Sequence, residues 1–121
     1  MERRDAEEFH KLFLESLDDI VRGVLGELPL EAIYYSLEKN YGIRREEIPE
    51  KPADFQTALV GLLGAGAPVI IRLIVRNLYG KLKVSDYQRD EHDLRRHVEI
   101  CKQIHMERKG IAKGDRLDGT A

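Results

Sequence analysis

Apolar residues in this chain recur at helical spacing, in stretches that glycine and proline separate. The most apolar stretch, residues 53–82, reads ADFQTALVGLLGAGAPVIIRLIVRNLYGKL and has a tight hinge over residues 64–68. In the half that follows the hinge, apolar side chains cover most of the expected helix surface and leave only a narrow polar strip. A helix that is apolar around most of its circumference has to be buried on several sides. We therefore expect a central helical hairpin made of residues 53–64 and 68–82.

Two earlier stretches have the spacing of amphipathic helices. Residues 5–25 place an apolar side chain at every third or fourth position, and the pattern stops at Gly26, a residue suited to a left-handed helix end. A second stripe covers residues 30–41. Residues 43–52 contain two prolines and many charges, so we expect an ordered connection there.

The C-terminal part predicts a fifth, more polar helix. Ser85 and Gln88 have the spacing of a capping box, which indicates a helix over about 86–108. Residues 109–121 hold several glycines and no apolar stripe, and we expect a flexible tail there. The predicted fold class is therefore all-α, a compact bundle of about five helices in a single domain over residues 1–108. The apolar seam of the fifth helix consists of Leu94, Val98, Cys101 and Ile104.

Composition narrows the class of protein. With 121 residues, of which 42% are hydrophobic and 35% charged, the chain is long enough to bury a core and is globular in composition. The high charge content is typical of thermophilic proteins. The only cysteine, Cys101, excludes an internal disulfide and agrees with a reducing compartment. We find no signal-peptide pattern, and the apolar run at 69–75 is too short to span a bilayer. A cytoplasmic protein without a membrane partner is expected.

Charge is unevenly distributed, although the formal net charge is only −2. Residues 1–31 are rich in acids, whereas residues 72–83 carry bases and no acid. Such basic residues could form a strip that contacts phosphates, although a solvated surface without a partner explains the same pattern. The negative net charge and the apolar character of the fourth helix count against a DNA groove binder. The strip would consist of Arg72, Arg76, Lys81, Lys83, Arg95 and Arg96.

Metal and catalytic chemistry have little support in the residue pattern. His97, Cys101 and His105 recur every four positions on one helix face, and imidazole and thiolate are zinc ligands. The first and third lie about 12 Å apart along a helix, so one ion cannot take all three. The adjacent acids Asp18 and Asp19 point about 100° apart and are expected at the solvated surface. We expect no metal, no cofactor and no enzymatic activity.

The order of four segments carries a family resemblance. They are AIYYSLEKNYGI (32–43), EEIPEKPADF (46–55), ALVGLLGAGAPVI (58–70) and RLIVRNLYGKL (72–82). Across residues 25–83 the chain resembles an archaeal family of helical output domains first named from Nitrosopumilus response regulators. The resemblance implies an archaeal origin and a regulatory or interaction role, and it implies no activity or ligand site.

These observations lead to three functional expectations. The first is a non-enzymatic interaction or signalling output module that self-associates, as a homodimer, through the first helix and the seam of the fifth. A signalling protein would then be a further partner. The second is a DNA-associated transcriptional regulator that uses the basic strip. A metal-binding or enzymatic protein is the third.

Overall fold

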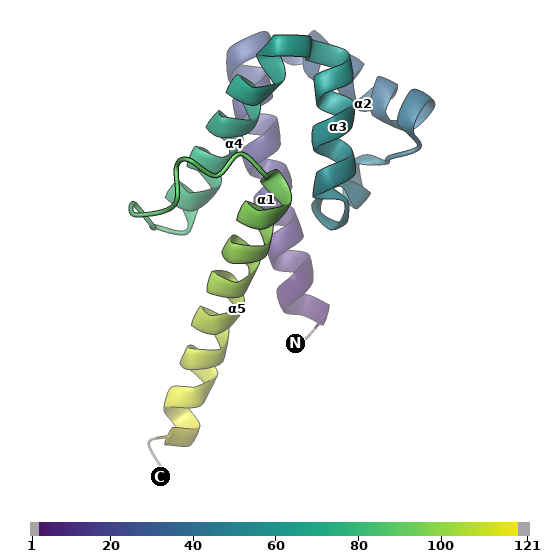
Figure 1. The fold of residues 1–121 in the computed structure, drawn as a ribbon. Coiled ribbons are helices and arrows are strands. Elements are labelled where there is room, and N and C mark those ends of the chain that lie inside the picture. The colour runs from purple at the N-terminus through teal and green to yellow at the C-terminus, as the bar shows by residue number, and fades with distance from the viewer. Residues whose placement is uncertain (1–2, 119–121) are drawn as a thin grey trace.

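The chain forms a bundle of helices (Figure 1). In a computed structural model, the backbone is described for residues 3–118 and the side chains for residues 4–110. Over residues 3–118 there are α-helices and short 3-10 turns and no strand, which confirms the all-α class. The elements are α1 (Arg3–Leu25), α2 (Glu27–Tyr41), η1 (Arg45–Glu50), α3 (Pro52–Leu63), η2 (Gly64–Gly66), α4 (Ala67–Lys81) and α5 (Leu94–Asp118).

Helix α4 lies at the centre of the bundle and contacts α1, α3 and α5. Its buried face includes Ile70, Ile74 and Leu78, while Arg72 and Arg76 are exposed. The sequence pattern predicted this division, because only a narrow polar strip interrupts the apolar circumference of the helix. The prediction of a central hairpin is therefore confirmed, with α3 and α4 as its two arms.

Two glycines with positive φ end helices where the sequence indicated. Gly42 has φ 67°, and its N–H bonds to the carbonyl of Glu38 at 3.2 Å, which ends α2 in a left-handed cap. Gly64 has φ 59°, caps the end of α3 and is the first residue of the 3-10 turn that leads into α4. A residue with a β-carbon is strained at these angles, so the tight turn depends on glycine.

The hairpin also satisfies a test for membrane-spanning helices. Within the described part of the chain, Pro52–Lys81 is the one helical stretch long and apolar enough to cross a bilayer, and 39% of its most apolar window is buried inside the bundle. The bend at Gly64 divides this stretch into two arms that pack on each other. The central helices of globular bundles have the same length and composition.

Helix α5 begins later and extends further than expected. It starts at Leu94 rather than near residue 86, and its backbone is helical to Asp118. The predicted capping box at Ser85 is wrong. Asp93 caps the helix instead, because its Oδ1 accepts from the N–H of Arg95 at 3.0 Å. The tail predicted over 109–121 is thus helical as far as Asp118, and residues 119–121 lie outside the described part of the chain.

The seam of α5 is covered by the chain itself. Leu94, Val98 and Cys101 are buried in the core, and Ile104 packs against its edge. They are covered because α5 packs on α1, α3 and α4 together. The bundle thus covers this seam within one chain, which counts against a contact with a second copy through it, and self-association itself stays a prediction.

We expect Val98→Glu to abolish cooperative folding rather than to release a folded monomer. An unpaired carboxylate in the core costs several kcal/mol, a large part of the stability of a domain this small. Thermal unfolding followed by circular dichroism measures the effect. Gln103→Glu, an exposed position on the same helix, serves as the control and should shift the midpoint little. A folded, helical Val98→Glu protein would show that the seam is not part of the core.

Candidate functional site

A cleft of about 450 Å³ lies between α4 and the segment 83–93, which crosses from α4 to α5. Its apolar lining comes from α4 and includes Ile71, Leu73 and Val75. Gln56 of α3 and His97 of α5 complete the wall. Residues far apart in the sequence thus meet around one concave surface, which is the usual form of a small-molecule site.

Three arginines line this cleft. Arg72 and Arg76 project from α4, one helical turn apart, and both side chains are exposed. No ion pair with an acid is found for either of them within the described part of the chain. Arg89 comes from the opposite wall, where its guanidinium donates to the carbonyl of Ser85 at 2.9 Å. The acid of the cleft, Glu91, is paired with Arg96 at 3.3 Å, so the cleft carries an excess of positive charge.

Aromatic contacts fix the segment 83–93 against the bundle. The ring of Tyr87 stacks on Tyr79 with centroids 4.1 Å apart and an interplanar angle of 9°. On the same ring, the guanidinium of Arg89 lies 4.8 Å from the centroid. This stacking links the connecting segment to the central helix, and it explains why residues 86–93 do not extend α5.

His97 adds a second link beneath the cleft. Its side chain is only 2% exposed, and its Nε2 lies 2.8 Å from the carbonyl of Glu91. A carbonyl only accepts, so Nε2 carries the proton and Nδ1 accepts from the Tyr79 hydroxyl at 3.0 Å. Burial raises the pKa of Tyr79, which keeps that hydroxyl protonated as the donor.

Gln56 anchors the start of α5 to α3. Its side-chain amide donates to the carbonyl of His92 at 2.8 Å, and its oxygen accepts from the N–H of Leu94 at 2.9 Å. Both ends of the amide are therefore used inside the protein. The wall of the cleft is held in place before any ligand arrives.

The predicted basic strip is divided by the fold. Arg72 and Arg76 lie at the cleft, and Lys83 lines a neighbouring hollow that shares Arg76 and Arg89 with it. The other three bases each contact an acid. Lys81 pairs with Asp19 at 3.3 Å, Arg95 with Asp93 at 3.9 Å and Arg96 with Glu91 at 3.3 Å.

Arg89 was not among the residues predicted for the basic strip, and it lies in a stretch that was expected to be helical but precedes the start of α5 at Leu94. Its position opposite Arg72 and Arg76 depends on the stacking of Tyr87 on Tyr79. Only the sequence Tyr87-x-Arg89, an aromatic residue with a base two positions later, hinted at such a packed segment.

The three residues considered as metal ligands do not form one site. Both ring nitrogens of His97 are hydrogen-bonded inside the protein. Nε2 of His105 is buried without a hydrogen-bond partner and lies 4.0 Å from the carboxylate of Glu8. Burial raises the pKa of the Cys101 thiol to about 12, which opposes formation of the thiolate that zinc or nucleophilic chemistry requires. Among the residues that the structure describes, no group of three or more His, Cys, Asp or Glu is arranged to hold a metal ion.

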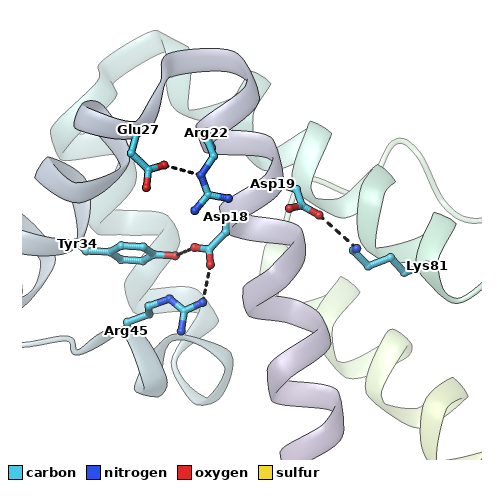
Figure 2. A network of polar contacts seen from close by, with 7 residues as sticks. All are labelled: Asp18, Asp19, Arg22, Glu27, Tyr34, Arg45 and Lys81. Atoms are coloured by element: carbon cyan, nitrogen blue, oxygen red, sulfur yellow. Dashed lines mark hydrogen bonds and ion pairs between the residues drawn. The ribbon is translucent and has the colours of Figure 1, made fainter.

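A polar network joins α1 to its neighbours at another place in the molecule (Figure 2). Asp18 accepts hydrogen bonds from the Tyr34 hydroxyl of α2 and from Arg45 of η1, and its side chain is only 19% exposed. The expectation of a solvated Asp18 was therefore wrong. Asp19 points away from it, toward Lys81 of α4, as the helical angle between adjacent residues requires. Since these groups satisfy one another, we interpret the network as structural.

Comparisons with known proteins do not assign the site. No family model matches the chain, and neither a curated protein nor a solved structure matches it. The resemblance to archaeal output domains remains a prediction from the residues. The role of the cleft therefore has to be argued from its own geometry and charge.

We expect Cys101→Ala to change how stability depends on alkaline pH. The native thiol has a raised pKa, so its contribution to stability is complete below the unfolded value of 9.0 and is lost as pH rises from there toward about 12. The parent should exceed the variant in unfolding free energy by about 1 kcal/mol at pH 7, the order of a small core truncation. That difference should then fall by about 1.4 kcal/mol for each pH unit above 9.

Urea unfolding of both proteins between pH 7 and pH 10.5 measures this difference. Both proteins share Tyr34, whose titration cancels in the comparison, and burial, the largest cause of the raised pKa of Tyr79, is also common to both. A difference that stays constant up to pH 10.5 would show that the thiol is not held in an apolar site.

Proposed function

We propose that this chain is a non-enzymatic helical interaction module, of the signalling output kind, which self-associates through an apolar end of the bundle. One observation carries the proposal, namely the exposure of large aliphatic side chains there. Their exposed fractions range from 38% at Leu25 to 77% at Leu28. We call this surface the apolar end, and it consists of Val24, Leu25, Leu28, Val60 and Val69.

These side chains come from segments that lie toward one end of the molecule. Val24 and Leu25 end α1, Leu28 begins α2, and Val60 and Val69 flank the bend between α3 and α4. The turn from α1 to α2 and that bend both lie at the top of the view in Figure 1. Large exposed apolar side chains gathered in one region mark an interaction site more often than a free surface.

A second copy of the chain fits this surface better than a charged partner does. The nearby ion pair between Arg22 and Glu27 is internal, so the turn from α1 to α2 adds no unbalanced charge. A two-fold axis would place the same apolar side chains opposite one another, which is a self-complementary contact. This contact replaces the α5 seam, which the bundle covers. The archaeal, cytoplasmic and thermophilic setting expected from the sequence belongs to the same proposal.

Solution mass at micromolar concentration tests the proposal. We expect the parent to sediment as a dimer, and Leu28→Glu and Val69→Glu each to sediment as a monomer with unchanged helical circular dichroism, because a carboxylate at the contact opposes its burial. Gln103→Glu adds the same charge on α5 and should leave the dimer intact. A monomeric parent at high concentration would contradict self-association, as would dimers formed by both apolar-end variants.

A DNA-associated regulator is the second candidate. The unpaired Arg72 and Arg76, with Lys83 close by, support it. Its weakness is that Lys81, Arg95 and Arg96 are engaged by acids. The remaining bases of the strip are three, Arg72, Arg76 and Lys83, which is few for a binding mode whose affinity grows with the number of phosphates neutralised.

A further inference from the structure

We propose that the cleft between α4 and the segment 83–93 binds a small organic anion, a carboxylate or phosphate carried on an aromatic or aliphatic body. The inference is independent of self-association, because it concerns different residues. It assigns a ligand class to a site that neither the resemblance nor the comparisons describe.

Size and lining determine the body of the ligand. The volume of about 450 Å³ falls within the roughly 300–1,000 Å³ of typical small-molecule pockets. The lining of Ile71, Leu73 and Val75 offers no hydrogen bonds from its side chains. Tyr87 adds an aromatic wall. An apolar body fits such a surface, since its burial releases water from both partners.

Charge determines the sign of the ligand. Arg72 and Arg76 stand at i and i+4 on α4, a spacing that puts both guanidinium groups on one face of the helix. Arg89 faces them from the segment 83–93, and the single acid, Glu91, is held by Arg96. Guanidinium groups bind carboxylate and phosphate oxygens through paired hydrogen bonds. A cation would instead be repelled.

The internal contacts of the cleft favour binding, because the site exists before the ligand arrives. Tyr79 holds Tyr87 by stacking, and the hydrogen bonds of His97 and Gln56 fix the chain between α4 and α5. These links use their polar groups inside the protein. Arg89 is already held by Ser85 and Tyr87, so Arg72 and Arg76 are the long side chains left to be ordered on binding, and the entropic cost is confined to them.

Two fluorescent probes that share one aromatic body test the inference on the full chain. The anion 1-anilinonaphthalene-8-sulfonate carries a sulfonate, and N-phenyl-1-naphthylamine is the same body without it. We expect the anion to bind the parent with 1:1 stoichiometry and the neutral probe to bind more weakly. The double variant Arg72→Gln/Arg76→Gln should weaken the affinity for the anion about tenfold or more, because two charge-assisted contacts are removed. The same variant should change the affinity for the neutral probe by less than about twofold.

Matched variants show whether the probe binds in the cleft or on another surface. Lys11→Gln/Lys39→Gln makes the same change in net charge at exposed positions elsewhere and should leave both probes unaffected. Leu28→Glu disrupts the apolar end and should also leave anion binding intact, whether or not the protein self-associates. If Leu28→Glu abolishes the signal and Arg72→Gln/Arg76→Gln does not, the probe reports the apolar end and the inference is wrong.

Competition distinguishes the sources of the anion. Displacement of the probe by decanoate identifies a carboxylate on an aliphatic body, and displacement by adenosine monophosphate identifies a phosphate on an aromatic one. Either result supports the inference. Displacement by duplex DNA alone would assign the arginines to nucleic acid and overturn it, and so would the absence of displacement by all three.

Discussion

The structure depends on burying α4 on several sides. Because this helix is apolar around most of its circumference, α1, α3 and α5 all pack against it, and the bend at Gly64 brings α3 back along it. The strip of α4 that remains outside carries Arg72 and Arg76. The same requirement that builds the core therefore presents two arginines on a rigid helix, where they form one wall of the cleft.

The second wall exists because aromatic packing outweighs local helix signals. Ser85 and Gln88 have capping spacing, yet Tyr87 stacks on Tyr79 and the chain runs across α4 until Asp93 caps α5. Tyr79 and Tyr87 are eight positions apart and do not belong to one helix, so their stacking leaves no mark in local periodicity. The central hairpin and the first two helices were predictable from apolar spacing and glycine stops, whereas the start of α5 was not.

The candidate site was also only partly predictable from the sequence, because ion pairs decide which bases remain free. The basic residues were visible in the sequence, but which of them remain unpaired depends on contacts such as that between Lys81 and Asp19, on different helices. Asp18 likewise belongs to a polar network because Tyr34, on a different helix, donates a hydrogen bond to it. The seam of α5 was correctly recognised as apolar, but spacing alone did not show whether the bundle or a second copy covers it. Burial of Val98 identifies the bundle.

Native-state hydrogen exchange tests the central position of α4 most directly. Amides in the helix that is packed on several sides should open only by global unfolding, so the slowest exchange is expected over residues 74–78, at the free energy of global unfolding. Amides of α2, which has an exposed face, should exchange faster through local opening. If residues 74–78 exchange as fast as α2, the bundle is not organised around α4, and the cleft loses its rigid wall.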